Sequence, residues 1–200
     1  MVDPAQPPEP DPADWRSPDP DRTFVARYEC IAPALCAWSM RHIGQTVRAR
    51  VEVDDVMQET WLRAYGKRGD FRGDERAFRA WIFAIAKIVL LEVVRSVRRL
   101  HRVQINDGAT SLLLALDGVH ESVTRLTQRL VRDETIARFL DRLARLPPED
   151  QDLISFCGLE GATCADAARK LGISTDAAVK RWQRLRARLG EEGLGHDWVA

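Results

Sequence analysis

The stretch "AARKLGISTDAAVKRWQRL", from Ala167 to Leu185, places cationic side chains on a short helix that follows a tight turn. Gly172 separates two helical stretches, and Ser174 is the predicted N-cap of the second. Cationic side chains on such a helix can bind phosphates, and its first residues can reach the edges of bases. The pattern is typical of a helix-turn-helix DNA-binding unit. The residues predicted to face outward are Ser174, Thr175, Asp176, Lys180, Arg181 and Arg184.

The rest of this unit is predicted to pack behind the basic helix. Thr163 with Asp166 resembles a capping box at the start of the first helix, and Gly190 is predicted to close the second. The stretches "DETIARFLDRLARL" and "PPEDQDLISFCGLEG" are predicted to be further helices, one of them with a proline in its first turn. A solvated helical bundle without DNA remains the alternative. The predicted packing set is Ala167, Ala168, Leu171, Ile173, Ala178 and Trp182.

A second set of candidate side chains lies in "VEVDDVMQETWLRAYGKRG". Asp54, Asp55, Gln58 and Glu59 are predicted to lie on an outer helical face together with Leu62. A carboxylate and amide face can bind a basic partner through charge-assisted hydrogen bonds, although a merely solvated face is the alternative. The predicted inner face is Val53, Val56, Met57, Thr60, Trp61 and Ala64.

A third set follows in "FRGDERAFRAWIFAIAKIVLLEVVRSVRRLHR", where Asp74 is a plausible N-cap of a long helix. Phe71 and Arg72 lie in the loop that precedes this helix. Arginines at the other end suit phosphates. The apolar stripe is Phe78, Trp81, Ile82, Ile85, Val89 and Val93, and the terminal cations are Arg95, Arg98, Arg99 and Arg102.

The totals are those of a globular helical protein, with 45% hydrophobic and 30% charged residues and a net charge of zero. Residues 1–22 hold most of the prolines and are acidic, which predicts a disordered tail and leaves the remainder net basic. No signal peptide and no apolar run of membrane-spanning length is found, so we expect a cytoplasmic protein without membrane insertion. The cysteines are expected to be buried or half-buried thiols, with redox sensing unsupported and no metal or cofactor site expected.

Two parts of the chain together resemble a known family. "DDVMQETWLRAY", "FRGDERAFRAWIFAIAK" and "VVRSVRR" closely resemble region 2 of bacterial RNA polymerase sigma factors of the sigma-70 family. The segment "LARLPPEDQDLISFCGLEGATCADAARKLGISTDAAVKRWQRLRARL" resembles their region 4. The presence of only these two regions, joined by a linker, is the layout of the extracytoplasmic-function (ECF) class.

The resemblance implies an all-α fold of two small helical domains joined by a flexible linker. The expected boundaries are a region 2-like domain over 23–102, a linker over 103–132, a region 4-like domain over 133–190 and a C-terminal tail over 191–200. Within 103–132, the stretch "SLLLALDGVHESVTRLTQRL" is either a marginal helix or a tether. The implied function is promoter recognition and transcription initiation as a non-catalytic subunit of RNA polymerase.

The resemblance also implies the role of each set. Asp54, Asp55, Gln58 and Glu59 would bind core RNA polymerase (β′ and β subunits), and the outward residues of the basic helix would bind promoter DNA at the −35 element. An anti-sigma factor, if one exists, would be a further partner. Family members commonly carry Asn where this chain has Ile88. The implied −10 contacts are Phe71, Arg72, Trp81, Lys87, Arg95, Arg98 and Arg99, with Trp81 mainly expected in the core.

Two other hypotheses remain open from the sequence. A stand-alone helix-turn-helix regulator would bind an operator as a dimer without polymerase. A sigma-like decoy without DNA binding would keep its protein partner after loss of Lys180, Arg181 and Arg184. An enzyme is not expected, because the four histidines lie in unrelated contexts and no Gly-rich phosphate loop occurs.

Overall fold

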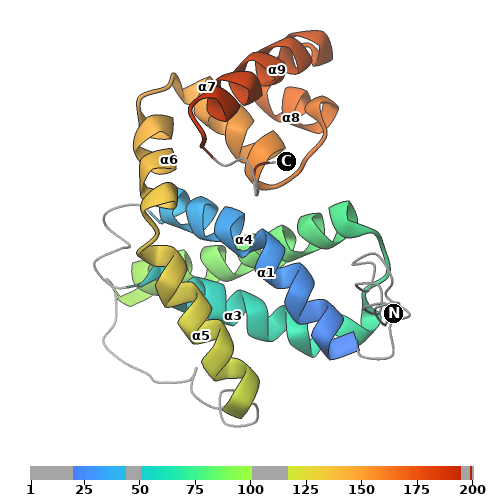
Figure 1. Cartoon of the computed structure of the whole chain (residues 1–200), viewed down its shortest axis with the longest axis vertical. Helices are drawn as coiled ribbons and strands as arrows, with labels where there is room; N and C mark the ends of the chain where they lie inside the picture. The colour runs from blue at the N-terminus through green and yellow to red at the C-terminus, as the bar shows by residue number, and fades with distance from the viewer. Residues whose placement is uncertain (1–19, 44–50, 101–116, 195–198, 200) are drawn as a thin grey trace, which may run out of the picture.

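The computed structural model describes residues 20–43, 51–100, 117–194 and 199, and within these it describes no side chains for residues 20, 97–100 and 117–122. Every regular element in these ranges is helical, which confirms the all-α prediction (Figure 1). The elements are α1 (Pro20–His42), α3 (Val53–Gly66), the 3₁₀ turn η1 (Arg68–Asp70), α4 (Glu75–Leu100), α5 (Asp117–Val131), α6 (Glu134–Ala144), α7 (Pro148–Leu153), the π-helix η3 (Ile154–Leu159), α8 (Cys164–Leu171) and α9 (Thr175–Glu191).

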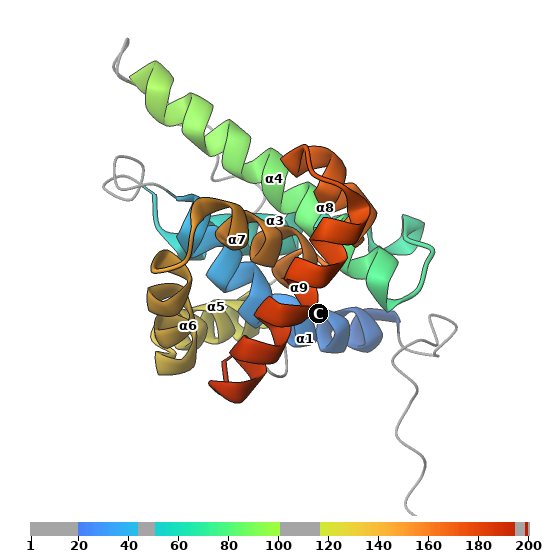
Figure 2. The same ribbon diagram turned by 90° about the horizontal axis from the view of Figure 1, so that it is seen from above.

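Helices α1, α3, α4 and α5 form an N-terminal bundle, while α7, η3, α8 and α9 form a C-terminal unit. Figure 1 shows the C-terminal unit above the bundle, with α6 rising along one side between them. Seen from above in Figure 2, α4 runs under α8 and projects beyond the bundle. The two units therefore stack, and they touch through α1 and η3.

An aromatic cluster fills the centre of the N-terminal bundle. Phe24 of α1 lies 5.6 Å from both Tyr65 of α3 and Phe78 of α4, measured between ring centroids and in edge-to-face geometry. Trp61 stacks on Tyr65 at 4.6 Å, and the Tyr28 hydroxyl donates to the Met57 carbonyl oxygen at 3.1 Å. Rings in these arrangements add to the stabilisation from apolar burial, so this cluster fixes α3 against α1 and α4.

Two features of α1 run against simple sequence rules. The first is Pro33, which lies inside the helix. A proline inside a helix removes one N–H donor, but Ile31 and Leu35 on either side are buried and hold the chain in place. The predicted disordered tail also ends too late, because α1 begins at Pro20 and Asp21 forms an ion pair with Arg68. Residues 1–19 lie outside the described part.

The segment left open as a marginal helix or a tether is a helix from Asp117 onward. This helix, α5, packs on α3 and α1, and it buries Val123, Thr127 and Leu130. Residues 103–116 of the expected linker lie outside the described residues. The part of the linker that is described is thus attached to the N-terminal bundle.

The C-terminal unit has the predicted helix-turn-helix geometry. Thr163 Oγ1 accepts from Asp166 N at 2.9 Å to start α8, and Gly172 ends that helix with φ 68°. Ser174 Oγ accepts from Ala177 N at 3.2 Å to start α9. Helix α9 continues one residue past Gly190, to Glu191. The predicted packing set is confirmed: Ala167, Ala168, Ala178 and Trp182 are buried, and Leu171 and Ile173 are half-buried against the core.

Candidate polymerase and nucleic-acid interfaces

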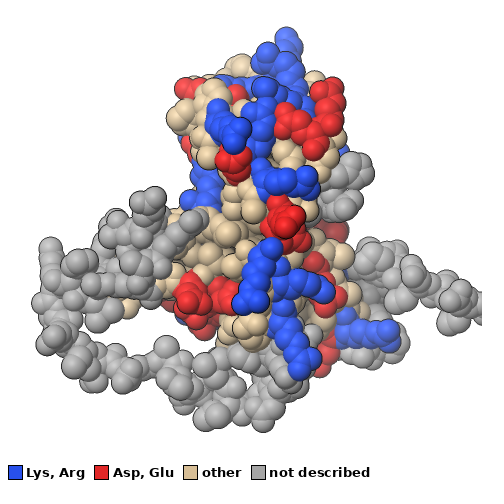
Figure 3. All heavy atoms as spheres, turned by 60° about the vertical axis from the view of Figure 1, so that its left-hand side comes forward, with Lys and Arg blue, Asp and Glu red and all other residues tan. Residues whose placement is uncertain are grey.

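The outer face of α9 presents polar and cationic side chains to solvent. Ser174, Thr175, Asp176, Lys180 and Arg184 are all exposed, as expected for the outward set. Figure 3 shows Lys and Arg side chains spread over the upper part of the molecule, the C-terminal unit, with acidic side chains between them. A capped helix with an exposed cationic face can place its first turn at base edges and its lysine and arginine at phosphates.

Arg181 does not face outward with the others. Its Nη2 lies 3.0 Å from Glu149 Oε2, and its Nε donates to Asp150. Both carboxylates belong to the first turn of α7, and these contacts raise the pKa of Arg181. The expectation that Arg181 points away from the unit is therefore wrong, because α7 packs along α9 and supplies two carboxylates on that side.

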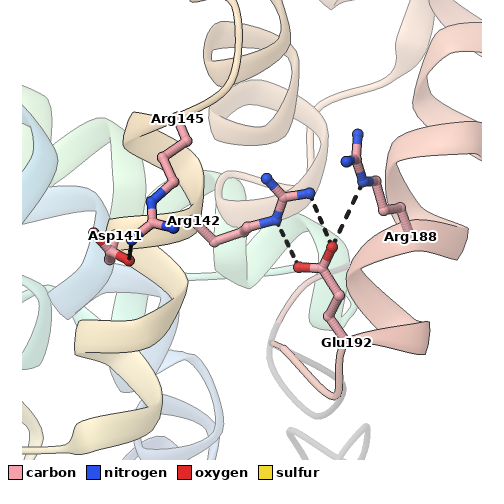
Figure 4. Close-up of polar contacts among 5 residues, drawn as sticks. All are labelled: Asp141, Arg142, Arg145, Arg188 and Glu192. Carbon is pink, nitrogen blue, oxygen red and sulfur yellow. Dashed lines mark hydrogen bonds and ion pairs between the residues drawn. The ribbon is translucent and has the colours of Figure 1, made fainter.

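A charged contact also fixes the far end of α9. Arg142 of α6 donates through Nε and Nη2 to the two carboxylate oxygens of Glu192, at 2.7 and 2.9 Å (Figure 4). Arg188 Nε lies 3.5 Å from the same carboxylate. The bidentate geometry is a strong form of ion pair, so it ties α6 to the residue that caps α9. Figure 4 also shows the separate Arg145–Asp141 pair within α6.

The acidic face of α3 begins in a capping box. Asp55 Oδ2 accepts from Glu52 N at 3.3 Å, and Glu52 in turn caps the third residue of the helix. Asp54 is half-buried, and its Oδ1 is buried without a hydrogen-bond partner. Burial raises the pKa of Asp54, the nearby Glu52 and Asp55 raise it further, and Arg132 opposes the shift. Asp55, by contrast, is exposed to solvent.

One turn further along α3, the carboxylates lie in a network with α4. Arg63 Nε lies 2.6 Å from Glu59 of its own helix, and Arg63 Nη2 lies 2.7 Å from Glu92 of α4. Gln58 and Glu59 remain half-exposed. Leu62 was expected on this outer face, but it is buried, because α3 is covered by α4 and α5 on separate sides as well as by α1. The four predicted polymerase-binding side chains therefore lie on the first two turns of one helix.

A pocket lies in front of α4, at the loop that precedes it. The pocket has a volume of about 250 Å³ and includes Arg68, Phe71, Arg72 and Phe78 in its lining. Phe71 stacks on Trp81 with ring centroids 5.0 Å apart. The Trp81 side chain is half-buried. Arg72 is exposed, and its Nη1 donates to the carbonyl oxygens of Gly69 and Phe71 at 2.6 and 2.7 Å. An aromatic wall beside arginines suits an unpaired base with its phosphate.

The remaining predicted residues of α4 do not share this site. Lys87 lies two turns further along and pairs with Glu160 of the C-terminal unit at 2.6 Å. Arg95 is exposed, and the side chains of Arg98 and Arg99 lie outside the described part. Ile88 is 53% exposed, which is unusual for a large apolar side chain. The structure thus brings Phe71, Arg72 and Trp81 together and separates Lys87 and Arg95 from them.

The helical periodicity of the sequence did not identify the residues that join the two units. Trp38 Nε1 donates to Glu160 Oε1 at 3.1 Å, and Arg41 lies 2.7 Å from Asp152. Arg79 Nη1 donates to the carbonyl oxygen of Leu159 at 2.9 Å. These residues are 80 to 122 positions apart in the sequence, so no local pattern could have paired them. In the structure, Glu160 directly follows the π-helix η3, and π-helices are frequent at functional sites.

The cysteines differ partly from expectation. Cys36 and Cys157 are buried, and burial raises the pKa of each thiol to about 12. Cys164 is half-buried, but Cys30 is exposed, contrary to the prediction. Over the described ranges, no group of three or more metal-ligating side chains could hold an ion. No helix in the same ranges is long and apolar enough to cross a membrane.

Sequence comparison with known proteins agrees with the architecture described above. The profile of sigma-70 region 2 matches residues 27–100, which span α1, α3 and α4. The RNA polymerase sigma factor CnrH of Cupriavidus metallidurans is 33% identical over 141 residues, covering 69% of this chain and 71% of CnrH. The ECF RNA polymerase sigma factor SigL of Mycobacterium tuberculosis is 28% identical over 174 residues, covering 84% of this chain and 90% of SigL. No solved structure gives a significant match.

A helical bundle that matches region 2, followed by a helix-turn-helix unit, defines a promoter-recognition subunit of RNA polymerase. The chain belongs to the sigma-70 family, in its ECF class. The ECF sigma factor BldN of Streptomyces coelicolor is 28% identical over 72% of this chain, which spans about half (51%) of BldN. As a sigma factor, the protein directs core RNA polymerase to promoter DNA and initiates transcription, and it is a non-catalytic subunit.

Proposed function

We propose that the two DNA-binding functions are divided between the loop before α4 and the outer face of α9. Phe71 and Arg72, at the mouth of the pocket before α4, contact the −10 element as its strands separate. Trp81 supports Phe71 through their stacked rings, and Arg95, Arg98 and Arg99 follow the phosphates. Bases that leave the duplex can stack on aromatic side chains, while arginines hold the backbone.

The −35 element is assigned to α9. Ser174, Thr175 and Asp176 occupy its first turn, where a recognition helix meets base edges. Lys180 and Arg184 lie one and two turns further and are exposed for phosphate contact. The single observation that carries this assignment is the capped, cationic outer face of α9, which is left uncovered on a braced helix-turn-helix.

Core polymerase binding is assigned to the first two turns of α3. Asp55 is exposed, while Asp54, Gln58 and Glu59 are partly so, and together they present carboxylates and an amide along one helix. Such a face complements a basic partner, and we assign it to the β′ subunit. The protein would act in the cytoplasm, where core polymerase is found. An anti-sigma factor that covers α3 or α9 would compete with these contacts.

Run-off transcription tests the proposal. Purified protein is mixed with bacterial core polymerase and fragmented genomic DNA, and the transcripts are sequenced. We expect transcripts that require the protein and that share sequence near −10 and −35. Specific DNA binding without polymerase, together with no transcripts in its presence, would instead support a stand-alone regulator.

A further inference from the structure

A buried carboxylate of the C-terminal unit is bound by the N-terminal bundle. Glu160 is 5% exposed and follows directly after η3. Its Oε1 accepts from Trp38 Nε1 of α1 at 3.1 Å, and its Oε2 accepts from Lys87 Nζ of α4 at 2.6 Å. A buried carboxylate is costly unless it is paired and hydrogen-bonded. Both oxygens of Glu160 obtain these partners from the other unit.

A second ion pair crosses the same boundary. Arg41, near the end of α1, lies 2.7 Å from Asp152 of α7. The Arg41 side chain is 19% exposed and that of Asp152 is 44% exposed, so the pair sits at the rim of the contact. A rim pair contributes less than a buried one, but it fixes the register of the two surfaces.

The backbone of η3 accepts a third cation. Arg79 Nη1 donates to the carbonyl oxygens of Gly158 and Leu159, at 3.3 and 2.9 Å. Carbonyl groups at a helix C-terminus carry partial negative charge and favour such a donor. Gly161 has φ 68°, and a Cβ atom there would lie 2.8 Å from Arg79 Cδ. The left-handed backbone conformation of Gly161 favours glycine, and the absence of a side chain leaves room for Arg79 in its present position.

The contact occupies two cations of α4. Lys87 is one of the −10 contacts that the family resemblance implies, and Arg79 lies on the same helix two turns earlier. Both are hydrogen-bonded to the C-terminal unit in this arrangement. Phosphates would have to displace Glu160 and the η3 carbonyl groups to reach them.

The stacked arrangement is also too short for a promoter. The positions that name the −10 and −35 elements are about 25 base pairs apart. At about 3.4 Å per base pair, this spacing corresponds to about 85 Å along the DNA. A compact chain of 200 residues is about 40 Å across. The loop before α4 and the outer face of α9 therefore cannot contact both elements at once while the two units remain stacked.

We propose that the Glu160, Asp152 and η3 contacts form an autoinhibitory latch, which keeps the free protein closed and must open before both promoter elements are bound. This inference rests on the functions proposed for α4 and α9. Core polymerase would favour the open form if it binds the two units apart, because a ligand shifts a population toward the state that it binds better.

A charge-swap series tests the latch. The full-length chain is prepared as Arg41→Glu, as Asp152→Arg and as the double variant, and its radius of gyration is measured by small-angle X-ray scattering without DNA or polymerase. Binding of a fluorescein-labelled single DNA strand of mixed sequence is measured by anisotropy. Arg145→Glu is the matched control, because it reverses a charge in an exposed pair within α6.

We expect each single variant to have a larger radius of gyration and about 5-fold tighter strand binding, and the double variant to return to wild-type values. The two single variants change net charge in opposite directions, so a simple charge effect on DNA binding would move their affinities apart. An unchanged radius in both single variants, affinities that follow net charge, or no recovery in the double variant would overturn the latch. Run-off transcription by the wild-type protein tests the proposed function separately.

Discussion

Arg142 and Glu192 form a bidentate ion pair that joins α6 to the cap of α9, at 2.7 and 2.9 Å (Figure 4). The pair connects the helix beside the N-terminal bundle to the proposed −35 recognition helix. It is a local brace of α9, separate from the latch at Glu160.

Replacing Glu192 with Gln is expected to lower the melting temperature at pH 7. Hydrogen bonds from Arg142 lower the pKa of Glu192. A carboxylate with a lowered folded pKa stabilises the fold above its unfolded pKa, about 4.3, and this contribution is lost as the pH falls through the folded value. Thermal melts at pH 7 and at low pH should therefore show a difference between wild type and Glu192→Gln that shrinks on acidification. Asp141→Asn is the control and should change little, because its pair with Arg145 is exposed.

Neutralising the outer face of α3 is expected to weaken core polymerase binding by about 10-fold. The double variant Asp55→Asn and Glu59→Gln keeps hydrogen-bonding atoms in place, so the helix cap and the fold should persist. Fluorescence anisotropy with labelled protein and core polymerase measures the affinity, and circular dichroism checks the fold. Glu92→Gln is the matched control, because it removes the other carboxylate on Arg63 and lies outside the proposed face. Equal losses in the two proteins would argue against docking at this face.

The cationic side chains of α9 are expected to differ in how much they contribute to −35 binding, according to whether they pair with carboxylates of the protein. Lys180→Ala and Arg184→Ala should each weaken −35 binding and reduce the slope of log affinity against log salt by about one. Arg181→Ala should reduce the slope less and lower the melting temperature more, because Arg181 already pairs with Glu149 and Asp150. The measurement is filter binding of holoenzyme at a series of salt concentrations. A full unit of slope lost in Arg181→Ala would mean that its guanidinium reaches DNA.

Replacing Ile88 with Asn is expected to change promoter opening without loss of stability. Ile88 is 53% exposed, so a polar side chain replaces apolar surface that already faces water. The amide can hydrogen-bond an exposed base edge, which isoleucine cannot do, so base preference at one −10 position should sharpen. Permanganate footprinting of promoters varied across the −10 element measures the effect. Leu91→Asn, at a comparably exposed site one turn away, is the control.

Local chemistry in the sequence predicted several helix starts and ends. Asp74 accepts from Ala77 N at 2.8 Å, and Thr163, Gly172 and Ser174 act as predicted. Such caps depend on residues within four positions of one another, so a single sequence contains the necessary information. The helix-turn-helix followed from the same signals.

The sequence could not supply contacts between distant segments. Pro33 is retained inside α1 because of core packing, and Arg181 turns inward because α7 supplies two carboxylates. In the sequence, nothing distinguishes Glu160 from other charged residues beside a glycine. Its contacts with Trp38 and Lys87 appear only in the folded structure. Each of these depends on tertiary neighbours, which periodicity and propensity do not encode.

The docking of α5 on α3 and α1 has a consequence for which promoters suit this protein. With α5 attached to the bundle, only α6 and the short turn at Arg145 join the bundle to the helix-turn-helix unit, so they limit how far the two units can separate once the latch opens. A short connection tolerates little variation in the number of base pairs between its two binding elements. Target genes of this sigma factor should therefore share a nearly constant spacer, and inserting or removing a base pair should reduce initiation sharply unless α5 detaches.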